Sequence, residues 1–172
     1  MPGLALHGYG GLPNMSGYAG EALQWRLSAF DALSVHELHD VLQLRSEVFV
    51  VEQNCVFQDI DGSDAQAMHV LGKRVAGDRQ LLAYARCFPA GIKFAEASIG
   101  RVVTRSNVRG SGLGHLLIEQ AVSMVCSLWG TQAIRIGAQA RLANYYRGHG
   151  FVDVGVAYIE DGIDHLEMLW QP

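Results

Sequence analysis

The chain has 172 residues, 49% of them hydrophobic and 17% charged, which indicates one globular domain and excludes a disordered, collagen-like or coiled-coil protein. Its 13 Lys and Arg residues against 17 Asp and Glu give a formal net charge of −4, which argues against a nucleic-acid or anionic-membrane partner and favours a cationic one. Cys55, Cys87 and Cys126 lack the spacing of a zinc or disulfide site, and no apolar run approaches the roughly 18 residues of a membrane helix, so we expect a cytoplasmic protein with reduced thiols.

The first 20 residues contain six of the 20 glycines and two of the four prolines. Because this composition disfavours regular structure, it predicts a flexible glycine-rich arm at 1–20. The remaining residues, 21–172, are predicted to form a single domain.

The first half of this domain carries the patterns of three strands and one helix. Apolar and polar residues alternate from Leu23 to Leu27, as in a half-buried strand, and Ser34 with Glu37 has the spacing of a helix capping box. Residues 53–66 are polar and lack a sustained period, which predicts a loop. The elements expected here are a strand at 23–27, a helix at about 35–49, and strands at about 67–73 and 80–88 joined by a hairpin turn at 76–78.

The second half of the domain has the pattern of a β-α-β unit. A strand rich in Ile and Val, a glycine loop and an amphipathic helix follow one another, and a further strand comes next. A crossover of this kind makes its two strands parallel. The elements expected here are a strand at 97–104, the loop at 109–114, a helix at 113–128, a strand at 132–138, a short helix at 141–149 closed by Gly150, and strands at 151–158 and 165–170.

The glycine loop, Arg109-Gly110-Ser111-Gly112-Leu113-Gly114, is the clearest candidate binding site. Free backbone N–H groups and the positive end of the helix dipole converge there, and such a site attracts phosphate. The loop lacks the lysine of a P-loop and the G-x-G-x-x-G spacing of a dinucleotide fold, so both classes are disfavoured. A glycine-rich connection without any ligand is the alternative that composition leaves open.

Two motifs carry a resemblance to a known family. The strand I-G-R-V-V-T at 99–104 followed by R-x-x-G-x-G at 109–114 resembles motif A of the GNAT superfamily of acyl-coenzyme A-dependent N-acetyltransferases. Residues 142–151, which end in Tyr-x-x-x-Gly-Phe, are similar to motif B of that superfamily. Further segments at 45–53, 59–62, 138–139 and 160–168 look like its ElaA-like branch. The resemblance covers about residues 23–170.

The resemblance implies a fold, a donor and a reaction. The fold would be an α/β (α+β) one, with a mostly antiparallel mixed sheet in which one parallel pair of strands splays around the cofactor. The donor would be acetyl-CoA, and its acetyl group would pass to a primary amine by direct attack. A non-catalytic protein that binds acyl-CoA as a sensor or partner module is the alternative.

The resemblance also implies roles for individual residues. The backbone amide of Val103 would stabilise the negative charge on the thioester carbonyl, and Tyr146 would return a proton to the leaving thiolate. Gln139 stands where many family members have asparagine, which puts a side-chain contact with the pantetheine arm in question. The residues expected to bind the cofactor are Val102, Val103, Thr104, Arg109, Gly110, Ser111, Gly112, Leu113, Gly114, Gln139, Asn144 and Tyr146.

The general base and the acceptor are less defined. His69, His165, Glu47 and Glu96 are candidate bases, and we select His165 because it lies in a motif of the family and has a useful ordinary pKa. Neither a metal site nor a particular acceptor is predicted: a small-molecule or peptide amine fits, and a homodimer is left open. A gathering of acidic residues around the acceptor mouth would favour a cationic amine. The acidic residues considered are Glu52, Asp59, Asp61, Asp64, Glu160, Asp161 and Asp164.

Overall fold

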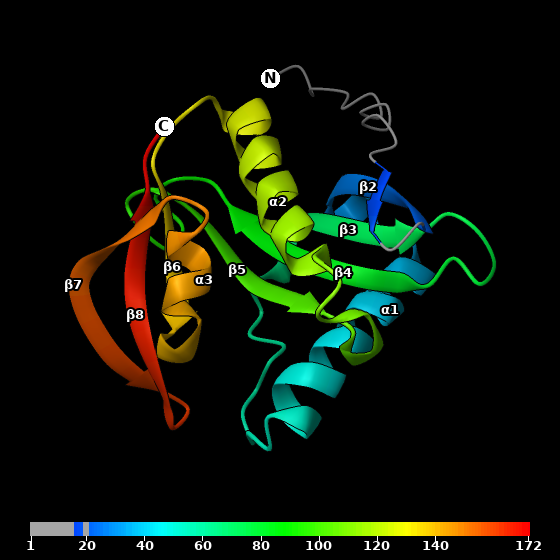
Figure 1. Cartoon of the computed structure of the whole chain (residues 1–172), viewed down its shortest axis with the longest axis horizontal. Helices are drawn as coiled ribbons and strands as arrows, with labels where there is room; N and C mark the ends of the chain where they lie inside the picture. Colours follow the sequence, from blue (N-terminus) through cyan, green and yellow to red (C-terminus); the bar gives the residue numbers. More distant parts are fainter. Residues whose placement is uncertain (1–15, 19–20) are drawn as a thin grey trace.

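Eight strands form one mixed sheet in the computed structural model, which describes residues 16–18 and 21–172. The strand order is β1-β2-β3-β4-β5-β6-β8-β7, and Figure 1 shows the sheet running across the molecule. The strands are β1 (Ser16–Tyr18), β2 (Glu21–Ala29), β3 (Met68–Arg74), β4 (Leu81–Phe88), β5 (Ala97–Thr104), β6 (Ile134–Gln139), β7 (Phe151–Glu160) and β8 (Ile163–Trp170).

The helices begin and end where local chemistry allows. The helix α1 begins after Ser34, whose hydroxyl accepts the N–H of Glu37 while the Glu37 carboxylate accepts the N–H of Ser34, as the capping box predicts. It continues as a π-helical segment, η2, so the helix predicted over 35–49 extends to Glu52. The helices are α1 (Val35–Arg45), η2 (Ser46–Glu52), α2 (Leu113–Trp129) and α3 (Ala143–Arg147), with short 3-10 turns η1 (Phe30–Ala32), η3 (Asp64–Gln66), η4 (Ser106–Val108) and η5 (Ala140–Leu142).

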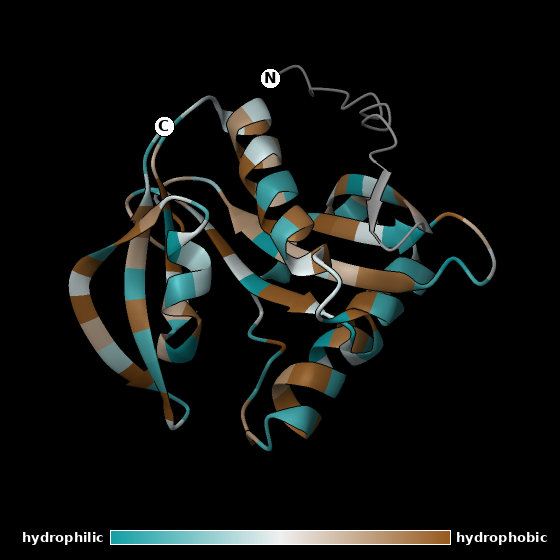
Figure 2. Ribbon diagram, in the orientation of Figure 1, coloured by the Kyte–Doolittle hydropathy of each residue, from teal (hydrophilic) through white to brown (hydrophobic). Residues whose placement is uncertain are grey.

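The two long helices cover opposite faces of the sheet. Adjacent strand residues point to opposite faces, and Val70 and Leu82 belong to the apolar cluster under α2, whereas Leu71 and Leu81 belong to the cluster with α1. Figure 2 shows apolar bands on α2 and along the strands beneath it. Burial of both faces explains why every residue of β4 is buried.

The sheet opens between its two parallel strands. β5 and β6 pair in parallel at Ala97 with Ile134 and at Ser98 with Arg135, and within residues 21–172 the two strands pair no further. All other neighbouring strands are antiparallel. The predicted mixed sheet with one splayed parallel pair is therefore confirmed.

A β-bulge in β5 accompanies this divergence. Tyr84 pairs with Val103 but Arg86 pairs with Gly100, so two residues of β5, Arg101 and Val102, lie opposite one residue of β4. Arg101 adopts a φ of +51°, which is uncommon for a residue with a side chain. A bulge of this kind bends the strand, and it lies in the part of β5 after Ser98, where the pairing with β6 has ended.

Some predicted boundaries shift. The final strands are longer than predicted because the turn between them consists of two residues, Asp161 and Gly162, with φ values of +49° and +78° that suit a tight hairpin. The helix predicted at 141–149 is shorter, because its first residues form a 3-10 turn and α3 ends at Arg147. The predicted arm lies mostly outside the described residues, although Ser16–Tyr18 pairs with β2 as β1.

Candidate functional site

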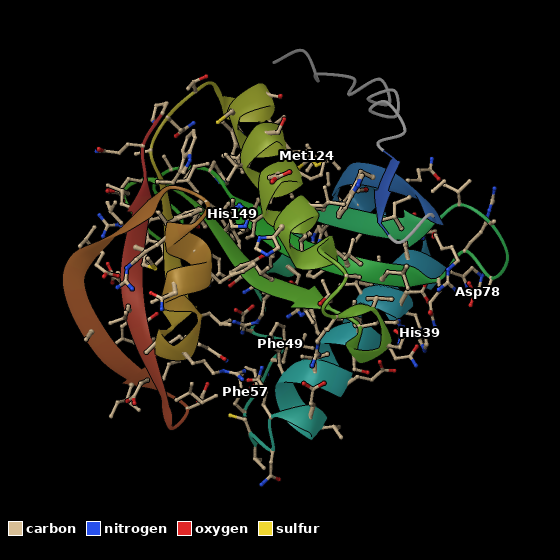
Figure 3. The ribbon with its side chains drawn as sticks, viewed as in Figure 1. His39, Phe49, Phe57, Asp78, Met124 and His149 are labelled. Atoms are coloured by element: carbon tan, nitrogen blue, oxygen red, sulfur yellow. The ribbon has the colours of Figure 1, made fainter. Side chains whose placement is uncertain are left out.

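A cavity of 790 Å³ follows the opening between β5 and β6. At one end it is lined by the glycine loop and α3, and at the other by η2, the loop after it, and the ends of β4, β5 and β7. Figure 3 shows Phe49 and Phe57, which both line the cavity, near each other between α1 and the strands. The cavity is lined by ten of the residues predicted for the site: Val102, Val103, Thr104, Arg109, Gly110, Gly112, Gly114, Gln139, Tyr146 and His165.

The glycine loop presents an open backbone surface to this cavity. Gly110 and Gly112 have φ values of +76° and +91°, and a Cβ atom built on either would meet no atom within 4 Å. The first turn of α2 leaves backbone N–H groups without helical acceptors, next to the positive end of a 17-residue helix. This combination of open space, free donors and positive potential fits a pyrophosphate group.

Two residues of the loop direct their side chains into the protein and not into the cavity. The Ser111 hydroxyl donates to the carbonyl oxygen of Val108, and Leu113 is buried in the apolar cluster under α2. Neither lines the cavity. Their contribution to a ligand can come from the backbone alone, so their predicted role stays a prediction.

Arg109 is held by an acidic neighbour. Its guanidinium donates to both carboxylate oxygens of Glu52, at 2.5 and 2.9 Å, and to the carbonyl of Thr104 at 3.3 Å. This hydrogen-bonded guanidinium keeps the pKa of Glu52 below its ordinary value. Arg109 therefore lies beside the glycine loop, and a phosphate would compete with Glu52 for it.

The diverging part of β5 supplies the middle of the cavity. The side chain of Val103 packs with α1 and that of Val102 packs with the α2 cluster, so both side chains belong to the core. Only their backbone groups are left to face a ligand lying along β5. An extended chain of amide groups, such as a pantetheine arm, would pair with this edge as an added strand does.

The two adjacent tyrosines of α3 have different surroundings. The Tyr145 hydroxyl donates to the carbonyl oxygen of Gly114 at 2.5 Å and its ring packs on His115 and His149. The Tyr146 hydroxyl has no hydrogen-bond partner among residues 16–18 and 21–172, and the side chain lines the cavity. Burial raises the pKa of Tyr146 to about 12, which keeps its proton in place at neutral pH.

Gln139 and Asn144 are placed differently. The Gln139 amide donates to Gln53 at 3.0 Å and accepts from Arg141 at 2.9 Å at the wall of the cavity. Asn144 is exposed and accepts from Arg147 at 2.7 Å, outside the cavity lining. The structure thus brings Gln139 to the site but not the side chain of Asn144.

His165 lies on β8 at the cavity wall. Its Nδ1 is 2.8 Å from the carbonyl of Ile163, its ring stacks on Tyr158, and its Nε2 is 3.9 Å from a carboxylate oxygen of Glu160. Because a carbonyl can only accept, Nδ1 carries the proton of the neutral ring and Nε2 has the lone pair. Tyr158 also lies on the lining, with its hydroxyl over Gly137, where a Cβ would come within 2.2 Å of it.

The other candidate bases point elsewhere. His69 is fully buried, with its ring nitrogens 2.8 Å from the Tyr84 hydroxyl and 3.0 Å from the Asp64 carbonyl. Burial lowers its pKa. Glu47 and Glu96 are each paired with an arginine at 2.7 Å, and none of these three side chains lines the cavity.

Most of the acidic residues considered for a cationic acceptor are neutralised. Asp59 binds Arg45 and Arg101, Asp64 binds Arg45 and Arg86, and Asp61 binds Arg86, all at 2.7 to 2.9 Å. Hydrogen bonds and charges from these arginines hold the pKa values of Asp61 and Asp64 below their usual range despite burial. Glu160 and Asp161 do line the cavity. Four of the acidic residues, Glu52, Asp61, Glu160 and Asp161, therefore do line the cavity, but Glu52 and Asp61 are paired with arginines that the sequence pattern did not connect to them.

Sequence reasoning missed several side chains of this end of the cavity. Arg86, Lys93 and Arg101 line it, together with Phe49 and Phe57. Arg101 was visible as a charge inside an apolar strand, which was a usable signal. The remaining four come from four different segments, namely β4, the loop after β4, η2 and the loop after η2, and nothing in their spacing indicates a common site.

The described residues contain neither a membrane-spanning helix nor a cluster of metal ligands. No helix of residues 16–18 and 21–172 is long and apolar enough to cross a membrane. The same part of the chain contains no group of three His, Cys, Asp or Glu side chains placed to hold a metal ion.

Comparisons with known proteins agree with the fold and show the family. A family model described as "Acetyltransferase (GNAT) domain" matches residues 47–172. The crystal structure of Escherichia coli ElaA has a TM-score of 0.78 and 37% identity, over 87% of this chain and 99% of that one. An acyl-CoA N-acyltransferase from Pseudomonas aeruginosa has a TM-score of 0.77 and 40% identity, over 85% and 98%. A UPF0039 protein of Synechocystis is 36% identical over 149 residues, which are 87% of this chain and 96% of that protein.

Proposed function

The chain belongs to the GNAT acetyltransferase family, and we propose that it transfers the acetyl group of acetyl-CoA to a primary amine by direct attack. The observation that carries this proposal is that a glycine loop at a helix N-terminus, an unpaired strand edge and Tyr146 all line one cavity. These are the three parts that binding and cleaving an acyl thioester requires.

Acetyl-CoA supplies an acetyl group activated as a thioester. The pyrophosphate would be held by the backbone N–H groups of 110–114, and Arg109 would add its charge once released from Glu52. The pantetheine arm would lie along β5, where residues after Ser98 leave β6. The loop conformation supports this, because a side chain at Gly110 or Gly112 would fill the space that the phosphates need.

The backbone N–H of Val103 would donate to the thioester carbonyl oxygen. As the amine attacks, a C–N bond forms, negative charge develops on that oxygen, and a preorganised donor in a water-poor cleft stabilises it. The C–S bond then breaks, and Tyr146 gives its proton to the departing sulfur. Its raised pKa of about 12 means that the hydroxyl holds that proton at neutral pH.

The incoming amine must lose a proton, and Nε2 of His165 is the base we propose. The contact of Nδ1 with the Ile163 carbonyl leaves the lone pair on Nε2, and the side chain lines the cavity. A carboxylate oxygen of Glu160 lies 3.9 Å from this nitrogen.

We propose a cytoplasmic location and leave the partner open between a small-molecule and a peptide amine. Cys55, Cys87 and Cys126 are free thiols, as in a reducing compartment. A homodimer stays a prediction.

The direct test measures thiol release from acetyl-CoA over a broad panel of amines, together with binding of CoA by calorimetry. Release that depends on both the amine and the enzyme supports the proposed reaction. Stoichiometric CoA binding without release from any amine would favour the alternative, an acyl-CoA-binding sensor. No CoA binding at all would contradict both.

A further inference from the structure

The end of the cavity away from the glycine loop has a composition that selects an acceptor. It combines cationic side chains with aromatic rings: Arg86, Lys93 and Arg101 line it, as do Phe49, Phe57, Phe88 and Phe94. An acceptor that is simply a hydrophobic amine or a polycation would not explain three cations at this wall. The hydrogen-bond donors of these cations that lack an acceptor decide which ligand the wall can bind.

The ion pairs of this wall leave an excess of positive charge. Four cations, those of Arg45, Arg86, Lys93 and Arg101, face three carboxylates, those of Asp59, Asp61 and Asp64. Arg45 is fully buried and takes part of the charge of Asp59 and Asp64. The cations of this network that reach the cavity are therefore Arg86, Lys93 and Arg101, and the carboxylates of Glu160 and Asp161 lie elsewhere on the same lining.

Arg101 has unused donors on both of its terminal nitrogens. Its Nε donates to Asp59 at 2.8 Å, but its nearest other carboxylate oxygen, on Asp61, is 3.8 Å from Nη2. Within the described part of the chain, its two terminal nitrogens make no hydrogen bond. The guanidinium lies 6.0 Å from the ring centre of Phe49 and 5.6 Å from that of Phe57, which hold it in place. An arginine fork fixed in this way is suited to an incoming carboxylate.

The β-bulge of β5 includes Arg101 itself. Ile99 packs in the α2 cluster, and Arg101, two residues later, would share its face in a regular strand. The bulge turns Arg101 to the α1 side instead, where it meets Phe49 and Asp59. A φ of +51° would cost glycine little, so an arginine here bears strain that a side-chain function would account for.

The buried neighbour Arg86 adds a second observation. Its side chain is 4% exposed, and both terminal nitrogens donate to Asp61 or Asp64. Its Nε is buried and has no hydrogen-bond partner among the residues that the structure describes. This guanidinium holds Asp61, which in turn lies between Lys93 and Arg101, each 3.8 Å away. Asp61 is thus oriented by Arg86 and does not close over Arg101.

We propose that the acceptor is an α-amino acid with an apolar side chain, whose carboxylate binds Arg101 and whose side chain packs against the phenylalanines. This inference rests on the proposed function. Arg101 is two residues before Val103 along β5, so a carboxylate held by Arg101 and an amine attacking at Val103 belong to one small molecule. Phe49 and Phe57 provide the apolar surface for the rest of it.

The test compares amino acids with their amides, since the amide removes only the negative charge. Phenylalanine, tryptophan, leucine and methionine and their four α-amides are the probes, with thiol release from acetyl-CoA as the readout. We expect kcat/KM to favour the free carboxylate by about tenfold or more, the value of a charge-assisted hydrogen bond. Amidation lowers the basicity of the α-amine and leaves more of it neutral, so amine reactivity alone would give the opposite order.

Arg101→Gln should reduce that preference at least tenfold, whereas Arg101→Lys, which keeps the charge without the fork, should retain part of it. Arg79→Gln, an exposed arginine in the β3–β4 turn, is the matched control and should keep the full preference. Melting curves establish that each variant is folded. The ratio of kcat/KM for each amino acid to that for its amide is measured first on the wild-type protein. A ratio near one would contradict the proposal before any variant is made.

Amides used as well as the acids, or a polyamine used in preference to both, would overturn the amino-acid proposal and leave the acetyltransferase proposal standing. An unchanged preference in folded Arg101→Gln would overturn the assignment of Arg101. Absence of thiol release with every amine, in a protein that binds CoA, would overturn the proposed function and this inference with it.

Discussion

The two ends of the cavity are formed by different parts of the polypeptide, backbone groups at one end and side chains at the other. The glycine-loop end is made of backbone: consecutive residues at 109–114 supply N–H groups, and two left-handed glycines provide open space. The other end is made of side chains from η2, β4, β5 and the loops, held by buried ion pairs. A backbone site suits a constant ligand such as a pyrophosphate, whereas a side-chain site can be altered one residue at a time. This difference explains why the glycine-loop end is contained in one continuous motif, whereas the other end is assembled from separate segments of the chain.

The largest effect is expected between the two ends, at Tyr146. Tyr146→Phe keeps the buried ring but removes the proposed proton donor, so turnover should fall by about 10²–10⁴ with CoA affinity unchanged. Calorimetry and steady-state kinetics measure the two quantities.

Tyr145→Phe is the control, and the structure shows that it is not silent. Loss of its hydrogen bond to the Gly114 carbonyl should lower the free energy of unfolding by about 1 kcal/mol and leave turnover nearly unchanged. Equal loss of turnover in both variants would contradict the acid role of Tyr146.

The side-chain end should be the one that depends on ion pairs for stability. Asp64→Ala leaves the fully buried Arg45 and the nearly buried Arg86 without a shared carboxylate, so the free energy of unfolding should fall by about 3–5 kcal/mol. Urea denaturation measures this change. The exposed pair of Asp78 with Arg74 is the control, and Asp78→Ala should have a much smaller effect.

The same residue predicts a pH dependence. Asp64 has a lowered pKa in the folded state, so its contribution is fully present above its ordinary value of 3.8 and is lost as pH falls through the lower folded value. The stability difference between wild type and Asp64→Ala should therefore shrink in strong acid, below about pH 4. A constant difference down to pH 2 would contradict an ionised Asp64 in the folded protein.

The backbone end should be sensitive to added charge rather than to lost packing. Gly112→Asp places a carboxylate in the anion site, so CoA affinity should fall by about 100-fold or more with a small change in melting temperature. Gly77→Asp is a matched control, because Gly77 has a φ of +73° and equally open surroundings in the β3–β4 turn. If CoA bound Gly112→Asp normally, its pyrophosphate would lie elsewhere.

The smallest effect concerns the contact between the backbone end and η2. Glu52→Gln frees Arg109 and removes a negative charge near the phosphates, so CoA affinity should rise by about two- to fivefold, as for an exposed ion pair. Glu47→Gln, which breaks the neighbouring pair with Arg105, should leave the affinity unchanged. A weaker affinity in Glu52→Gln would mean that Glu52 orients Arg109 for the ligand.

The local patterns of the chain predicted much of the architecture. Alternation, the capping box at Ser34 and the β-α-β order predicted the strands, α1 and the parallel pair, and the motif resemblance indicated the family that the comparisons confirm. The arginine partners of Asp59, Asp61 and Asp64 were not predicted, because solitary acidic residues carry no information about which arginines reach them. Asn144 was selected by its place in a motif, yet its side chain points to Arg147.

The sequence by itself determined the features that depend on neighbours along the chain. These are the φ values that glycine permits at 110 and 112, the start of α2, and the different directions of the two adjacent tyrosines. Only the tertiary structure decided the pairing of Arg101 with Asp59, 42 residues apart, and the bulge that aims Arg101 at the cavity. The physical reason is that a hydrogen bond or ion pair acts over a few ångströms of space, and the distance along the chain between its partners is set by how the strands are ordered in the sheet.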